Sequence, residues 1–124
     1  MKWSFNDSAP IYAQLVEQLT LGIVRGEYPS GGRMPPVREL AMEAGVNPNT
    51  MQRALGELER LGLVYSQRTS GRFVTEDVAR IDGAKRELAE RQIGAFLRAM
   101  DALGYRPEEI PDLIREAREK EDTV

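Results

Sequence analysis

The hydrophobic pattern of this chain changes its period at Gly62, and that change limits the folds open to the first 75 residues. Before Gly62, apolar residues recur at the three- and four-residue spacings of amphipathic helices. After it, β-branched and aromatic residues at 63–66 and 72–74 flank a polar turn of about five residues, 67–71. Helix, helix, turn, helix and hairpin within about 65 residues is the order of a winged helix-turn-helix. The predicted fold class is therefore mainly α (α+β).

The first expected helix follows Asp7 and Ser8, which can cap it, and ends at Gly26. Pro10 lies in its first turn, where a missing N–H costs nothing. Its apolar stripe consists of Ile11, Leu15, Leu19 and Ile23. The next segment, 28–36, is rich in proline and glycine and is predicted to be a loop.

Two more helices precede the hairpin, which is expected over 63–75. The second helix is short and ends at Gly45. The third spans 47–61, with Asn47 as its cap and Pro48 in its first turn. The apolar residues expected on the buried faces of both helices are Val37, Leu40, Ala41, Ala44, Met51, Ala54, Leu55, Leu58 and Leu61.

The rest of the chain, 77–124, is predicted to be a helical tail appended to a winged helix-turn-helix domain at 1–76. One helix runs from about Val78 to Ala102, and Pro107 opens a second. Two such helices cannot bury both apolar stripes against each other, so the surplus predicts a partner, which we expect to be a second copy of the chain. The residues expected at this dimer interface are Leu88, Ile93, Phe96, Leu97, Met100, Ile110, Leu113 and Ile114.

Composition excludes several function classes. The chain has no cysteine and no histidine, so disulfides are excluded, and no metal or cofactor is expected. An enzyme would depend on carboxylates such as Glu57 and Glu59, or Glu108, Glu109 and Asp112, on exposed helix faces, and no catalytic role is expected for them. No apolar run approaches the roughly 20 residues that cross a bilayer, and the start lacks an apolar signal segment. The expected location is the cytoplasm.

The net charge of −3 is unevenly distributed. Residues 1–75 hold eight Lys/Arg and seven Asp/Glu, whereas residues 76–124 hold nine and thirteen. Salt screens charges beyond about 8–10 Å, so the acidic tail does not prevent the first segment from attracting phosphate.

The polar side of the third helix is suited to the major groove of DNA. Opposite its apolar stripe lie Asn49, Gln52, Arg53, Gly56 and Arg60, and no acid is near the amino-terminal end. Arginine, asparagine and glutamine near a helix start are the side chains that read base edges. The alternative is an ordinary solvated helix surface, which has the same polarity.

Flanking arginines favour the DNA interpretation. Arg38 begins the second helix, and Arg68 and Arg72 lie on the hairpin. Each could be a solvated surface residue, but together they stand where this motif meets phosphate. Tyr65 and Phe73 are expected in the hairpin core rather than as base-stacking groups.

Four motifs in order resemble the GntR family of bacterial regulators. They are Pro10-Ile11-Tyr12 with Gln14-Leu15, the run from Gly32 to Ala41, the run from Gly45 to Leu55, and Leu58-Glu59-Arg60-Leu61-Gly62-Leu63-Val64. Asn47-Pro48-Asn49-Thr50 with a short helical tail is similar to the YtrA-type subfamily, whose tail serves mainly for dimerisation.

The resemblance implies a sequence-specific dimeric repressor that binds an inverted-repeat operator. It implies that helix 47–61 enters the major groove and that hairpin 63–75 acts as the wing. The residues expected at the DNA are Arg33, Arg38, Asn47, Pro48, Asn49, Thr50, Gln52, Arg53, Arg68 and Arg72.

Two positions depart from the family pattern. Pro48 cannot make the contact that a basic residue makes in other subfamilies, and Thr69 replaces the first glycine of the wing motif, with only Gly71 kept. Thr69 therefore leaves the geometry of the wing tip open.

Two functional questions stay open. A winged-helix adaptor that binds protein rather than DNA is the alternative function. A small-molecule effector near Phe96, Met100 or Tyr105 is conceivable, although these residues also suit interface core.

Overall fold

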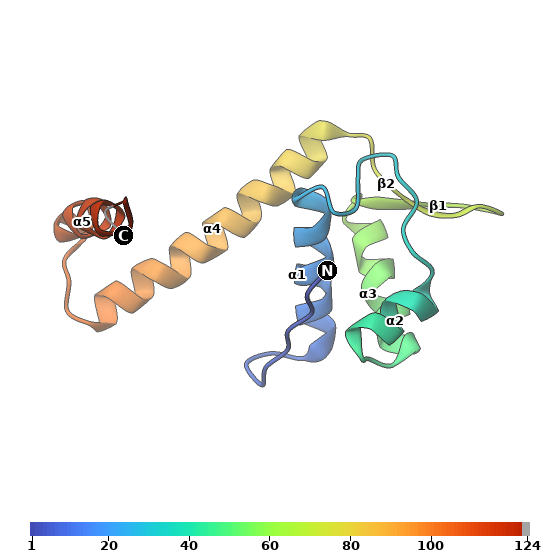
Figure 1. Cartoon of the computed structure of the whole chain (residues 1–124), viewed down its shortest axis with the longest axis horizontal. Helices are drawn as coiled ribbons and strands as arrows, with labels where there is room; N and C mark the ends of the chain where they lie inside the picture. The colour runs from blue at the N-terminus through green and yellow to red at the C-terminus, as the bar shows by residue number, and fades with distance from the viewer. Residues whose placement is uncertain (123–124) are drawn as a thin grey trace. The chain divides into compact units, whose positions relative to one another are not determined.

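A computed structural model describes residues 1–122 as two compact units, 1–86 and 87–124, of which the second is described up to residue 122 (Figure 1). The chain is mainly helical with one two-stranded sheet, and the predicted fold class is confirmed. The elements are α1 (Ile11–Val24), α2 (Val37–Ala44), α3 (Pro48–Arg60), β1 (Val64–Gln67), β2 (Gly71–Val74), α4 (Val78–Ala102), a 3-10 turn η1 (Pro107–Glu109) and α5 (Ile110–Asp122).

The core of the first unit lies where α1 and α3 pack together, with α2 against α3. The predicted apolar stripes supply most of it, but Ile11, in the first turn of α1, is exposed. The fully buried large side chains are Leu15, Leu19, Leu40, Met51, Leu55, Leu58, Leu63 and Val74.

Helix caps explain where α2 and α3 begin and end. Gly45 ends α2 with φ of +71°, the left-handed conformation that glycine adopts without strain. The Asn47 side chain accepts a hydrogen bond of 2.7 Å from the Asn49 backbone N–H, and Pro48 fills the first helical position, as predicted.

The expected cap of α1 by Asp7 or Ser8 is wrong. Pro10 is the N-cap residue, and no side chain caps the helix. Instead, the buried Gln14 amide reaches back, donating to the carbonyls of Asn6 (2.8 Å) and Ala9 (2.6 Å) and accepting from the Asn6 N–H (3.0 Å). These three hydrogen bonds hold the residues before Pro10 against the helix and take the place of a cap.

The turn of the hairpin is shorter than the sequence predicted. Gln67 pairs with Gly71 in the antiparallel register, so the turn is 68–70 rather than 67–71. Part of the expected loop 28–36 is also extended and lies along the outer edge of β2: the Met34 N–H donates to the Arg72 carbonyl (2.8 Å) and the Val74 N–H to the Gly32 carbonyl (2.9 Å). These bonds satisfy backbone groups that β2 would otherwise leave unpaired.

The two faces of the hairpin differ. Val64 and Val74 face the core and are buried. Tyr65 and Phe73 pair across the strands on the other face, with ring centroids 5.8 Å apart, and Tyr65 is 38% exposed. The expectation of a core position is therefore wrong for Tyr65, whereas Phe73 is half-buried; strand alternation places both rings on the face opposite Val64 and Val74.

The first turns of α4 belong to the first unit. Ala84 is buried, Ile81 packs against the same core, and the Arg80 Nε donates a hydrogen bond of 2.6 Å to the Leu61 carbonyl at the end of α3. The compact unit extends to Arg86, whereas the sequence predicted that the first domain ends at residue 76.

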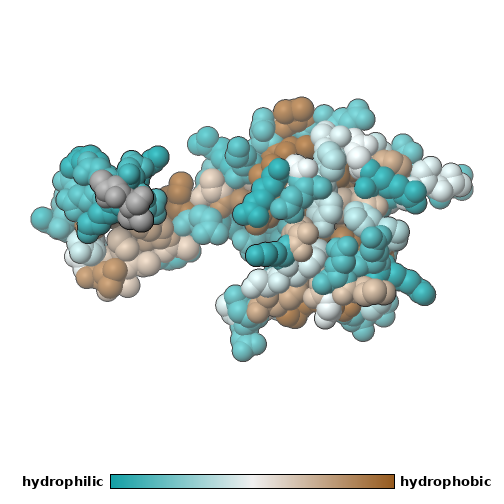
Figure 2. All heavy atoms as spheres, viewed as in Figure 1, coloured by the Kyte–Doolittle hydropathy of each residue, from teal (hydrophilic) through white to brown (hydrophobic). Residues whose placement is uncertain are grey.

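The second unit buries little of its apolar surface. Ile110 is buried, while Ile93, Phe96, Leu97, Leu103 and Ile114 are exposed, and tan and brown spheres mark apolar surface among its helices in Figure 2. An apolar hollow of 420 Å³ opens between Phe96 and Met100 of α4 and Leu113 and Ile114 of α5. Among residues 1–122, no helix combines the length and apolarity that crossing a membrane requires.

Candidate nucleic-acid interface

The exposed face of α3 is opposite the buried residues of the same helix. At about 100° per residue, Asn49, Arg53, Gly56 and Arg60 lie near its centre, and Gln52 lies toward one side. All five are exposed, and the first turn of this helix carries no acid. The face therefore offers amide and guanidinium donors with nothing negative at the helix start.

The four residues at the amino-terminal end of α3 differ in how available their side chains are to contact a ligand. Asn47 uses its side-chain oxygen for the cap, and Pro48 has neither an N–H nor a charge. Thr50 is half-buried, whereas Asn49 is exposed. Of these four side chains, Asn49 has the most access to a ligand.

On the α1 side of this face, a cluster connects α1 with α3. The guanidinium carbon of Arg53 lies 3.9 Å from the centroid of the Tyr12 ring. Arg60 forms an ion pair with Glu57, one of whose bonds, from Nε to Oε2, measures 2.9 Å. Hydrogen bonds from Arg60, with a smaller one from Tyr12, lower the pKa of Glu57.

On the hairpin side, Arg72 is not a free cation. Its Nε lies 2.8 Å from Glu59 Oε1, and its side chain is 19% exposed. Ser66 donates a second hydrogen bond to Glu59, and these two bonds, that from Ser66 first, lower the pKa of the Glu59 carboxyl. The pair connects the hairpin to the last turns of α3.

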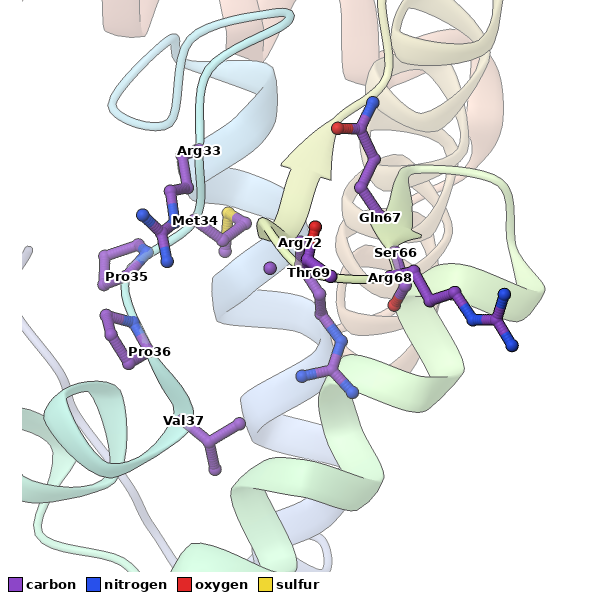
Figure 3. A pocket seen from close by; sticks show the side chains of 11 residues that line it. Arg33, Met34, Pro35, Pro36, Val37, Ser66, Gln67, Arg68, Thr69 and Arg72 are labelled. Carbon is purple, nitrogen blue, oxygen red and sulfur yellow. The ribbon is translucent and has the colours of Figure 1, made fainter.

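An open hollow of 460 Å³ separates the hairpin from the segment that leads into α2 (Figure 3). Arg33 lies on one wall, beside Gly71, whose added Cβ would be 3.2 Å from the Arg33 Nε. Arg72 runs down toward α3, whereas Arg68 extends away from the Arg33 wall. Arg38, one residue beyond this hollow on α2, is exposed.

The wing tip does not need a glycine at position 69. Within the described residues only glycines have positive φ, and at the tip it is Gly71, at +100°, that adopts it. Thr69 therefore fits the turn without strain, and the glycine kept from the family motif stands where the left-handed conformation occurs.

The residues predicted for dimerisation divide by burial. Ile93, Phe96, Leu97 and Ile114 are exposed; Leu88, Met100 and Leu113 are half-buried. Ile110 is 7% exposed and is thus already covered by its own chain.

Sequence reasoning missed the residues that order this surface. Tyr12 lies off the apolar stripe of α1, and the only expectation for Glu57 and Glu59 was that they have no catalytic role. The three-residue spacing of Glu57 and Arg60 was an available signal for their ion pair. Only the packing of the hairpin and of α1 on α3 pairs Glu59 with Arg72 and Tyr12 with Arg53.

Comparisons with known proteins agree on one family. Residues 11–74 match the profile of "Bacterial regulatory proteins, gntR family". The chain is 39% identical over 111 residues to the HTH-type transcriptional regulator YhcF of Bacillus subtilis, covering 90% of this chain and 92% of the relative. It is 39% identical over 70 residues to the HTH-type transcriptional repressor YtrA of the same organism, 56% of this chain and 54% of that one.

Solved structures extend the likeness to the tail. A GntR family transcriptional regulator from Listeria monocytogenes superposes with a TM-score of 0.82 at 38% identity, covering 90% of this chain and 98% of that chain. The DNA-binding domain of AraR, solved in complex with operator ORX1, gives a TM-score of 0.55 at 30% identity over 60% of this chain and 96% of that one.

Proposed function

Because the chain belongs to the GntR family and is a YtrA-type transcription regulator with a DNA-binding winged helix, we propose that it is a dimeric repressor of an inverted-repeat operator. The observation that carries this proposal is the exposed face of α3, rich in donors, free of acid in its first turn and flanked by arginines. Like the AraR domain that was solved on operator DNA, the chain would present this face to a duplex.

In the proposed complex α3 enters the major groove. Asn49 and Gln52 read base edges, because an amide offers both a donor and an acceptor to a base. The first turn, from Asn47 and Pro48 to Thr50, meets a phosphate through the Thr50 backbone N–H, since Pro48 has no N–H and the Asn49 N–H donates to Asn47.

The hairpin β1–β2 acts as the wing. Arg33, Arg38 and Arg68 contact the phosphate backbone on either side of the groove, since all three are exposed. Arg72 holds the wing in place through Glu59 rather than contacting DNA directly.

The tail, 77–124, is proposed to form the dimer. Its exposed apolar residues, together with the 420 Å³ hollow, would be covered by the same surface of a second copy. Leu88, Met100 and Leu113 would contribute their exposed parts, while Ile110 supports α5 from within. A two-fold dimer would place two α3 helices on half-sites about one helical turn apart.

The relatives are named as transcription regulators, and no enzymatic role or cofactor is proposed. Glu57 and Glu59 accept hydrogen bonds from arginine and have lowered pKa values, which makes them poor proton acceptors. The proposed location is the cytoplasm, where a repressor would meet its operator.

The test is binding to a duplex selected from random sequence by the wild-type protein, measured at several salt concentrations. A DNA reader binds this duplex more tightly than a shuffled one and loses affinity as salt rises. Arg38→Ala should weaken binding, whereas Arg25→Ala, which removes an exposed arginine at the end of α1, should not. An adaptor that binds only protein would select no duplex.

A further inference from the structure

Arg53 differs from the other arginines of the interface because an aromatic ring holds it. Its guanidinium carbon lies 3.9 Å from the centroid of Tyr12, which belongs to the first turn of α1. A solvated arginine samples many rotamers, and stacking on a ring restricts it to few. The guanidinium nevertheless stays accessible, because Arg53 is exposed.

Tyr12 is itself held in place by packing. It is half-buried and lies against the core of the first unit. It also helps to lower the pKa of Glu57, the residue one helical turn after Arg53 that binds Arg60. Such a ring is a firm support for Arg53 rather than a mobile contact.

The position of Arg53 points to a particular part of the duplex. In the major groove, helix side chains that point inward reach base edges, and those that lean toward a groove edge reach the phosphate backbone. Glu59, bound to Arg72 and Ser66, marks the hairpin side of α3, and Arg53, bound to Tyr12, marks the α1 side. Gly56 lies one turn after Arg53, and a Cβ added to it would have no atom within 4 Å, which leaves room for a DNA strand to approach.

We propose that Tyr12 is a positioning residue that holds the Arg53 guanidinium ready to bind a DNA phosphate on the α1 side of α3. The inference rests on the proposed function, since it assigns one backbone contact within that complex. The gain is entropic: an arginine already oriented in the free protein loses less freedom when it binds. Asn49 and Gln52 remain the base-reading residues.

The experiment is a double-mutant cycle on the selected duplex, measured by fluorescence anisotropy over a range of salt concentrations. Arg53→Gln removes the charge and should lower the slope of log affinity against log salt by about one. Tyr12→Leu should weaken binding about 2- to 10-fold, because Arg53 would then have to be ordered when it binds. Tyr12→Phe keeps the ring and should bind within about 2-fold of wild type. Tyr12→Leu combined with Arg53→Gln should bind as Arg53→Gln alone does.

Each outcome decides the inference. If Tyr12→Leu weakens binding equally with and without Arg53, the tyrosine does not act through the arginine. If Arg53→Gln changes the preferred base at one operator position and leaves the salt slope unchanged, Arg53 reads a base and the phosphate assignment is wrong. If wild type binds no duplex in a salt-dependent way, the proposed function itself fails. Urea midpoints of all variants separate these results from a loss of folding.

Discussion

Two helical glycines should respond to the same substitution with opposite signs. Gly56 lies inside α3, where no atom is within 4 Å of an added Cβ. Alanine in a helix interior is favoured over glycine by about 0.8–1.0 kcal/mol, chiefly because glycine loses more backbone freedom on folding. Gly56→Ala should therefore raise the free energy of unfolding by about 0.5–1 kcal/mol.

Gly22, inside α1, is the matched control. The same gain in helix propensity applies, but its Cβ would lie 2.7 Å and 2.8 Å from two carbons of the Tyr28 ring and 3.0 Å from Met1 Sδ. Tyr28 is half-buried, and burial, with smaller effects of Glu43 and Glu27, raises its pKa to about 12. Overpacking costs typically about 1–3 kcal/mol, which exceeds the propensity gain. Gly22→Ala should lower the free energy of unfolding by up to about 2 kcal/mol.

Urea unfolding followed by tryptophan fluorescence measures both effects, because Trp3 is the single tryptophan and packs against the core of the first unit. Protein concentration is held constant, since association shifts the midpoint, and an unchanged m-value licenses the comparison. Opposite shifts are expected. If both variants shift the same way, or Gly56→Ala destabilises, the packing at these two positions does not control the outcome and the reasoning is refuted.

Three further changes test other contacts. Gln14→Ala removes the amide that binds Asn6 and Ala9 and should lower the free energy of unfolding in urea by about 1–3 kcal/mol. The loss should exceed that from Gln18→Ala, and equal losses would contradict a special role for the Gln14 hydrogen bonds. Glu59→Gln should weaken the hairpin attachment by about 0.5–1 kcal/mol at neutral pH. The folded-state pKa of Glu59 is lowered, so its contribution to the free energy of unfolding is present above the unfolded-state pKa and is lost as pH falls through the folded-state pKa. The variant should lack this part of the acid dependence of stability. A pH profile identical to that of wild type would show that the Glu59–Arg72 pair does not stabilise the fold. Phe96→Asp should give a monomer in sedimentation while the protein stays folded, and a variant that remains dimeric would remove Phe96 from the interface.

Local chemistry accounts for what the sequence could predict. Caps such as Asn47, terminators such as Gly45 and the apolar stripe of α3 act over one or two helical turns, so their spacing predicts α2, α3 and the hairpin nearly residue by residue. Which face of α3 is exposed follows from the same periodicity.

Contacts between distant segments could not be predicted in this way. The sequence does not reveal that Arg72 binds Glu59, because Glu59 precedes it by thirteen residues and faces it only once the hairpin folds onto α3. Arg72 was therefore expected at the DNA. Tyr12 and Arg53 come from different helices, and the pairing of Gly32 and Met34 with β2 depends on where the chain returns after α1. The sequence therefore shows which side chains are present on the surface, and tertiary packing decides which of them are already engaged.

The backbone bonds from Gly32 and Met34 to β2 also bear on how this protein avoids aggregation. A two-stranded hairpin standing alone has two open edges, and each can recruit a strand from another molecule. Here one edge is occupied by the chain itself, and the other belongs to β1, which is only four residues long. Substituting Met34 with proline would remove the donor to Arg72 and reopen the occupied edge, so the variant would risk self-association through the wing.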